Sequence, residues 1–143
     1  MSAEDQTSVA TRPDAGTGQA AAPVDATDPG LLAWLEGATA AELDGLPFGV
    51  VAMAPDSTVQ HYNLAESRLA GLAPGRVVGR PFFSGVAPCM NNPLVAERFA
   101  AETNLDALID YVLTLRMSWQ KVRLRLLKAA SARRMYLVVE RRA

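Results

Sequence analysis

The chain contains a single cysteine, Cys89, which lies between an aromatic pair at positions 82–83 and Pro93. A lone thiol cannot form an internal disulfide, so three roles remain open: apolar core filling, a reactive nucleophile, or an attachment point. Inert core filling is the commonest of these for a lone cysteine. Pro88 fixes the backbone just before the thiol. We therefore expect Cys89 on an irregular segment that follows the aromatic pair.

Tyr62 and Glu66 are four residues apart, a spacing that places both side chains on one face if a helix begins between them. The plain interpretation is a half-buried aromatic ring beside a surface acid. A nucleophilic pair of Cys89 with His61 is the enzymatic alternative, but strand alternation turns His61 outward if Tyr62 points inward. His61 is the only histidine, so a zinc site would need carboxylates as further ligands. We expect neither an enzyme nor a metal site.

Several short elements must position these residues. Residues 50–53 and 58–62 predict two strands joined by a turn, and Asn63 can cap a helix over 64–69 that Gly71 ends. Further along, the pattern predicts a helix over residues 93–103 and strands over 107–117, 120–128 and 135–142. In strand 120–128 the apolar residues alternate with three bases, which we expect on the solvent-exposed face of a sheet: Lys121, Arg123 and Arg125.

The order of these elements predicts an α+β domain with a five-stranded antiparallel sheet. A hairpin, several short helices and a three-strand meander leave one sheet face for the helices and enclose a small apolar cavity. Residues 1–29 lack large apolar side chains and are expected to form a disordered tail. Residues 30–45 predict two short helices, the second with a capping box of Thr39 and Glu42. These helices form an N-terminal cap on the main domain at residues 46–143.

Composition limits the compartment and the partners. Hydrophobic residues make up 50% of the 143 residues, but no apolar run is long enough to span a bilayer and no secretory signal is visible. With one cysteine, the expected localisation is cytoplasmic. The bases near the C-terminus alternate with apolar residues, which is typical of a sheet face and not of a nucleic-acid site. We expect no nucleic acid, no membrane partner, and a monomer or weak homodimer.

Four stretches of the chain resemble the photoactive yellow proteins, blue-light receptors of the PAS superfamily. They occur in the order and spacing of that family: Leu43-Asp44-Gly45-Leu46-Pro47-Phe48-Gly49, Tyr62-Asn63-Leu64-Ala65-Glu66, Val78-Gly79-Arg80-Pro81-Phe82-Phe83 and Val86-Ala87-Pro88-Cys89. The resemblance covers about residues 31–142. It implies a PAS fold, with residues 46–143 as the photosensory domain.

The resemblance also implies a chromophore, p-coumaric acid (4-hydroxycinnamic acid), bonded as a thioester to Cys89. Its phenolate would accept hydrogen bonds from Tyr62 and Glu66. On illumination Glu66 would give up its proton and the N-terminal cap would partly unfold as the signal, while Met117 would assist thermal recovery. The pocket lining implied by the resemblance is Val51, Ala70, Leu72, Phe82, Val86, Ala87, Pro88, Met90, Leu113, Leu115 and Met117.

The chain departs from the family pattern at several of these positions. Ala70 stands where a threonine is usual, and Leu72 where an arginine often covers the phenolate end of the pocket. Met90, Leu113 and Leu115 also differ from the common residues. The alternative function is a PAS module without pigment, which either dimerises through the helix of Trp34 or senses another small ligand. The sequence does not indicate the downstream signalling partner.

Overall fold

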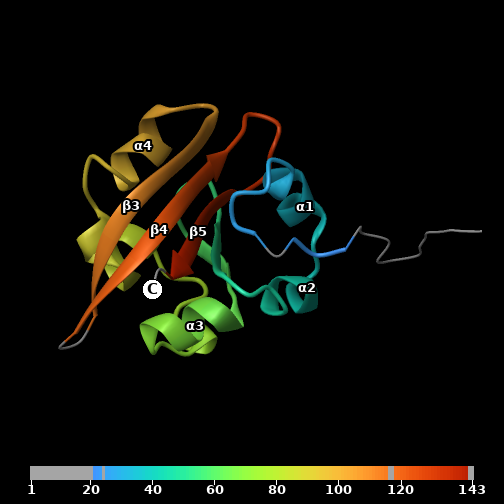
Figure 1. The fold of residues 1–143 in the computed structure, drawn as a ribbon. Helices are drawn as coiled ribbons and strands as arrows, with labels where there is room; N and C mark the ends of the chain where they lie inside the picture. The colour runs from blue at the N-terminus through green and yellow to red at the C-terminus, as the bar shows by residue number, and fades with distance from the viewer. Residues whose placement is uncertain (1–20, 24, 116–117, 142–143) are drawn as a thin grey trace, which may run out of the picture.

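A five-stranded antiparallel sheet forms the centre of the protein in a computed structural model that describes residues 21–23, 25–115 and 118–141 (Figure 1). The strand order is β2-β1-β5-β4-β3, so the N-terminal hairpin and the C-terminal meander join where β1 pairs with β5. The strands are β1 (Gly49–Met53), β2 (Val59–Tyr62), β3 (Leu105–Leu115), β4 (Ser118–Lys128) and β5 (Met135–Arg141). The predicted α+β class and five-stranded sheet are confirmed.

One face of the sheet carries helix α3 (Leu64–Ala70), helix α4 (Ala96–Ala101) and three short helical turns at Pro74–Arg76, Phe82–Val86 and Pro88–Met90. Helix α3 ends as predicted, because Gly71 adopts a left-handed backbone with φ 72°. Helix α4 is shorter than predicted. The side chain of Asn92 accepts hydrogen bonds from the amides of Leu94 and Val95, which holds this stretch in a turn before the helix begins.

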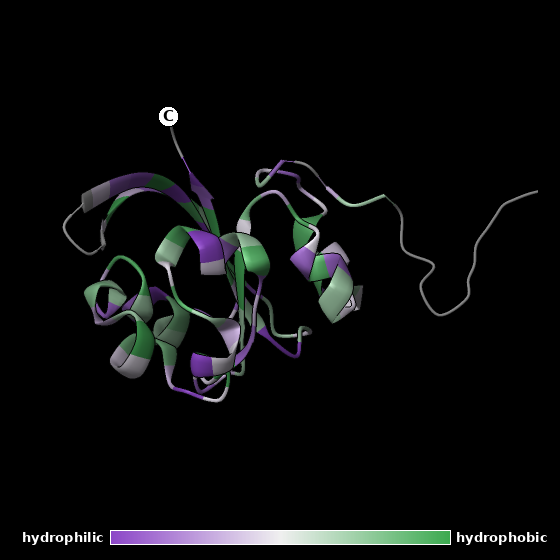
Figure 2. Cartoon of the chain, turned by 90° about the horizontal axis from the view of Figure 1, so that it is seen from below, coloured by the Kyte–Doolittle hydropathy of each residue, from purple (hydrophilic) through white to green (hydrophobic). Residues whose placement is uncertain are grey.

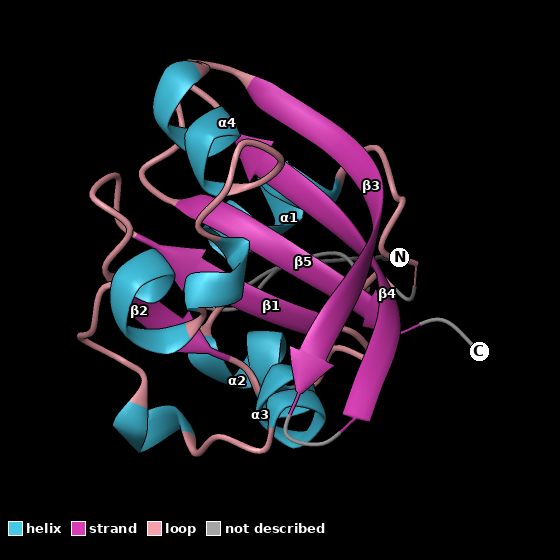
Figure 3. Cartoon of the chain, turned by 90° about the vertical axis from the view of Figure 1, so that its left-hand side faces the viewer, coloured by secondary structure: helices cyan, strands magenta, loops and turns pink. Residues whose placement is uncertain are grey.

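The opposite face of the sheet carries the cap, helices α1 (Leu31–Gly37) and α2 (Ala40–Asp44). Figure 2 shows hydrophobic segments (green) in the sheet and in the helices on both sides of it. Viewed from the side of α3 and α4, α1 lies behind the strands (Figure 3). The predicted capping box is present, with Thr39 and Glu42 each bonded to the backbone of the other. A second core cluster holds the cap to the sheet: Leu31, Trp34, Leu35 and Leu43 with Val50, Ala52, Leu127, Tyr136 and Val138.

The surroundings of Arg125 differ from two predictions: that this side chain faces solvent, and that the tail extends to residue 29. The alternation of β4 is as predicted, but Arg125 is not solvated: it is only 4% exposed, because the chain leading into α1 covers it. Its guanidinium binds both carboxylate oxygens of Asp106 and donates to the carbonyls of Ala26 and Asp28. Ala26 is itself buried, with 2% exposed. The packed chain thus starts before the tail boundary predicted at residue 29.

None of the helices in the described ranges is long and apolar enough to cross a bilayer.

Candidate functional site

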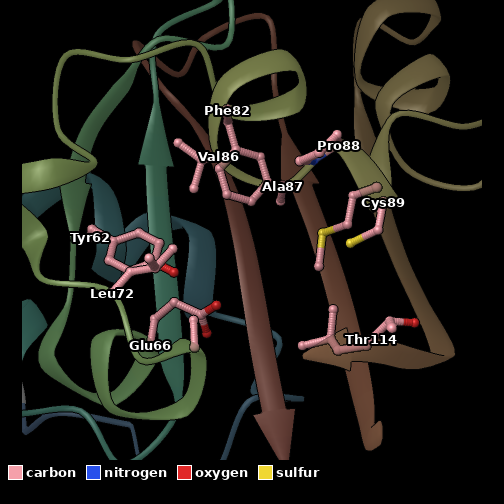
Figure 4. Close-up of a pocket in the computed structure, with 12 residues that line it drawn as sticks. Tyr62, Glu66, Leu72, Phe82, Val86, Ala87, Pro88, Cys89 and Thr114 are labelled. Atoms are coloured by element: carbon pink, nitrogen blue, oxygen red, sulfur yellow. The ribbon is translucent and has the colours of Figure 1, made fainter. Parts of the chain in front are cut away.

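A cavity of about 220 Å3 lies on the α3 side of the sheet, between α3, residues 82–90 and the end of β3 (Figure 4). Its lining is mostly apolar, with polar groups at a few positions: Tyr62, Glu66, Ala70, Leu72, Phe82, Val86, Ala87, Pro88, Cys89, Met90, Leu113 and Thr114. Cys89 lies across the cavity from Tyr62 and Glu66 (Figure 4). A small apolar cavity with few polar groups is the usual form of a small-molecule site.

Cys89 presents an exposed, free thiol at this cavity. Its segment is more regular than predicted, because the helical turn Phe82–Val86 is closed by a hydrogen bond from the Ala87 amide to the Phe82 carbonyl. The carbonyl of Cys89 accepts hydrogen bonds from the Tyr111 hydroxyl at 2.9 Å and the Asn92 side chain at 3.0 Å. The backbone that carries the thiol is therefore held by β3 and by the turn before α4.

Glu66 is buried in the first turn of α3, with 4% exposed, so the interpretation of this residue as a surface acid is wrong. Burial raises the pKa of the Glu66 carboxyl to about 8, and a hydrogen bond from the Tyr62 hydroxyl opposes this shift. Burial also raises the pKa of Tyr62, with a further contribution from Glu66. Both groups are consequently protonated at neutral pH. The Glu66 carboxyl can donate a hydrogen bond to an anionic ligand, and the single O–H of Tyr62 can do so once it turns from Glu66 to the ligand.

One carboxyl oxygen of Glu66 is left without a partner. Among the described residues, Oε1 of Glu66 is the one buried side-chain polar atom that makes no hydrogen bond. Leaving such an atom unbonded costs about 1–3 kcal/mol, so Oε1 is available to a hydrogen-bonding group of a bound ligand. Oε1 lies close to the backbone of Gly49, where an ideal Cβ would be only 2.3 Å away. The observed position of the Glu66 carboxyl thus requires a glycine at residue 49 of β1.

Asn63 links this carboxyl group to the cap. It is fully buried, and its Oδ1 accepts from the amides of Val50 at 2.9 Å and Glu66 at 3.0 Å. Its amide nitrogen donates to the carbonyls of Leu43 at 2.9 Å and Phe48 at 3.0 Å. The predicted helix cap is confirmed. The sequence did not predict the bonds to Leu43, Phe48 and Val50, which exist only because the fold brings these segments together.

No family model matches the chain. A photoactive yellow protein from Rhodothalassium salexigens is 32% identical over 104 residues, which cover 71% of this chain and 83% of the relative. The chain belongs to the photoactive yellow protein family.

Solved structures agree with this membership of the photoactive yellow protein family. The photoactive yellow protein domain of the sensor histidine kinase Ppr from Rhodospirillum centenum is 37% identical, with a TM-score of 0.68. The match covers 73% of this chain and 95% of that domain. A PAS domain of an HTR-like protein from Haloarcula marismortui shares the fold alone, at 15% identity, with a TM-score of 0.57 and coverage of 72% and 93%. The fold is a PAS fold, as expected.

Most of the positions expected to depart from the family pattern line the cavity. Ala70, Leu72, Met90 and Leu113 all line it, as do the other predicted lining residues apart from three. Val51 is fully buried in the neighbouring core but does not line the cavity. The predictions for Met117 and for the side chain of Leu115 lie outside the described residues.

Thr114 lines the cavity and was not predicted. It follows Leu113, and simple strand alternation would turn one of the two away from the site.

His61 lies away from the thiol, as strand alternation indicated. Its Nε2 is 3.0 Å from Oδ1 of Asp44, and His61 does not line the cavity. No group of three or more histidine, cysteine or acidic side chains that could hold a metal occurs among the described residues. The geometry required for a Cys–His nucleophilic pair is not found.

Proposed function

We propose that the chain is a blue-light photoreceptor that carries p-coumaric acid as a thioester on Cys89. The observation that carries this proposal is a cavity with an exposed thiol on one side and a buried, incompletely bonded carboxyl group on the other. An apolar cavity of about 150 Å3 accommodates benzene. A cavity of about 220 Å3 therefore leaves room for a phenol with a short acyl tail.

Cys89 would form the covalent bond. Its sulfur attacks the acyl carbon of an activated p-coumaroyl donor, so that a carbon–sulfur bond forms and the bond to the leaving group breaks. The leaving group takes the bonding electrons, and the thiol proton passes to solvent. The exposure of the thiol allows this reaction, and the hydrogen bonds of Tyr111 and Asn92 to the Cys89 carbonyl fix the point of attachment.

Tyr62 and Glu66 would hold the phenolate end. When bound, the chromophore supplies absorption of blue light and isomerisation of its double bond. Both residues are protonated at neutral pH and can donate charge-assisted hydrogen bonds, and such bonds offset the cost of an anion in a dry cavity. Leu72 lies at the cavity without any donor, so it shields this end by its bulk alone.

Glu66 would then release its proton towards the phenolate oxygen after illumination. The resulting carboxylate is buried and forms no ion pair with any described residue, a state that costs several kcal/mol. Asn63 connects the Glu66 backbone to Leu43 at the end of the cap. We propose that this cost loosens the cap, and that a downstream protein recognises the change by contact.

The experiment is attachment of the chromophore to Cys89→Ala protein. Wild-type chain mixed with activated p-coumaric acid should turn yellow and keep its colour through a denaturing wash, whereas the variant should lose it. Glu66→Gln protein is the matched control: it should retain the colour but absorb at longer wavelength, because an amide is the weaker donor to the phenolate. Covalent colour on Cys89→Ala would refute the site. A wild-type chain that stays colourless would favour the PAS module without pigment.

A further inference from the structure

A second hollow lies behind Glu66, and we call it the α3 pocket. Its volume is about 260 Å3, and it is lined in part by Gly49, Ala65, Arg68, Leu69, Val139 and Arg141. These residues come from the start of β1, the outer side of α3 and the end of β5. None of them lines the cavity at Cys89, which we call the chromophore cavity after its proposed ligand, so the two hollows are separate.

Gly49 is the point where the α3 pocket approaches the Glu66 carboxyl. The unpartnered Oε1 lies where the side chain of residue 49 would be, at 2.3 Å from an ideal Cβ. Glu66 lines the chromophore cavity, whereas Gly49 lines the α3 pocket. Because glycine has no side chain, only backbone atoms of residue 49 separate the carboxyl oxygen from the pocket. The carboxyl oxygen thus lies next to Gly49, which itself lines the α3 pocket.

The α3 pocket is suited to water. Two guanidinium groups line it: Arg141 donates to the Gln120 side chain, and Arg68 has no hydrogen-bond or ion-pair partner within the ranges that the structure describes. A hollow of this size with several polar groups can hold ordered water. The chromophore cavity next to Glu66 is lined instead by apolar groups such as Ala70 and Leu72, and would be filled by the ligand.

We propose that the α3 pocket is the port through which Glu66 exchanges its proton with solvent, and that Gly49 keeps this port open. The proton moves from the Glu66 carboxyl to water in the pocket, and an equivalent proton returns by the same route. The inference rests on the proposed function, in which Glu66 gives up a proton, and adds how that residue regains equilibrium with solvent. In this proposal Gly49 is a positioning residue, because its lack of a side chain lets the Glu66 carboxyl lie close to the α3 pocket.

The test is the rate at which Glu66 exchanges its proton for a deuteron in the full chain without chromophore. The carbonyl stretch of the protonated carboxyl reports the exchange after transfer to heavy water, and Glu66→Gln protein identifies the band by its loss. Ala65→Phe fills the α3 pocket from the helix. It should slow the exchange by about tenfold or more, because the proton must then leave by the slower route through the apolar cavity at Cys89 or by a local opening of the fold. Ala100→Phe, on an exposed position of α4, is the matched control and should leave the rate unchanged.

The rival route runs through the chromophore cavity, and Leu72→Phe tests it by narrowing that cavity. Slower exchange in Leu72→Phe with an unchanged rate in Ala65→Phe would overturn the port, as would an unchanged rate in both variants. If Ala65→Phe does not fold, Ala65→Met fills the same space with a more flexible side chain. Because no chromophore is present, failure of attachment at Cys89 and failure of the port are distinguishable.

Discussion

At the scale of single residues, Glu66 combines deep burial with an incomplete set of hydrogen bonds. Its neutral form is favoured because the ionised form would lose its hydration in the core. Tyr62 stabilises the ionised form in part, but one oxygen remains unbonded. A bound hydrogen-bond acceptor would therefore complete the hydrogen bonding of this carboxyl.

The free energy of unfolding should depend on pH through Glu66. Its pKa is about 8 in the folded chain against an ordinary value of 4.5, so the folded state holds more protons between these values. The stabilisation is fully present below pH 4.5 and is lost as the pH rises through about 8. Relative to Glu66→Gln, the chain without chromophore should lose a few kcal/mol across this window, measured by urea unfolding. A constant difference would show that the carboxyl titrates normally.

Gly49→Ala should destabilise the chain by about 1–3 kcal/mol, because the new methyl group would collide with the Glu66 carboxyl. Gly75→Ala is the matched control, since an added Cβ at Gly75 meets nothing within 4 Å. Thermal unfolding of the two variants measures the difference. Equal stability of both variants would mean that the Glu66 side chain moves aside at no cost.

Some of these site residues could be predicted from the sequence, and others could not. Cys89, Tyr62 and Glu66 could be predicted from the family motifs, and a lone thiol or an i, i+4 pair would not have sufficed. The close approach of Gly49 to Glu66 could not be predicted, because it depends on how α3 packs over β1. Thr114 was missed for a similar reason, since an alternating pattern assigns neighbouring strand residues to opposite faces.

At the scale of elements, one buried arginine connects the sheet to the cap. Arg125 on β4 binds Asp106 on β3 and two carbonyls of the chain that leads into α1. The alternating pattern of β4 was predicted, whereas the burial of Arg125 was not, because the bonds join segments about a hundred residues apart. The hydrophobic packing of α1 is thus supplemented by hydrogen bonds to the segment that immediately precedes the helix.

Arg125→Met should weaken the attachment of residues 25–31 while leaving the chromophore cavity intact. Hydrogen bonds to a charged group contribute about 1.5–3 kcal/mol each, so amide exchange in this segment should become faster. Arg123→Met is the matched control, because Arg123 pairs with Glu140 on the same sheet face and, within the described ranges, acts on residues 25–31 only through its charge near Asp25 and not through a hydrogen bond. Equal exchange in the two variants, measured by mass spectrometry, would contradict the role of Arg125.

At the scale of the whole molecule, the sheet separates two cores. The cavity at Cys89 and Glu66 belongs to the core under α3 and α4, and the cap covers a different core on the far side. The proposed signal from Glu66 to the cap would therefore pass around or through β1, and Asn63 offers a hydrogen-bonded route to Leu43. The order of elements predicted both layers, but this connection required the folded structure.

Illumination of the loaded protein should increase amide exchange in the cap, residues 31–44, while β4 stays protected. The cap is held by a modest apolar patch, whose burial at about 25 cal/mol per Å2 is comparable with the cost of a buried carboxylate. Glu66→Gln should reduce the increase, because an amide cannot become charged. If the cap exchanges equally in light and dark, the cap does not carry the signal, even where the colour test succeeds.

The two tryptophans of the chain provide an optical record of these changes. Trp34 lies in the cap with 9% of its surface exposed, whereas Trp119 is 82% exposed at the start of β4. The emission of Trp119, which already faces water, should not change when the cap detaches. The emission of Trp34 should shift to longer wavelength, because its indole moves from an apolar contact into water. A Trp119→Phe chain would accordingly fluoresce from the cap alone, and its emission colour would report cap release in real time without any added label.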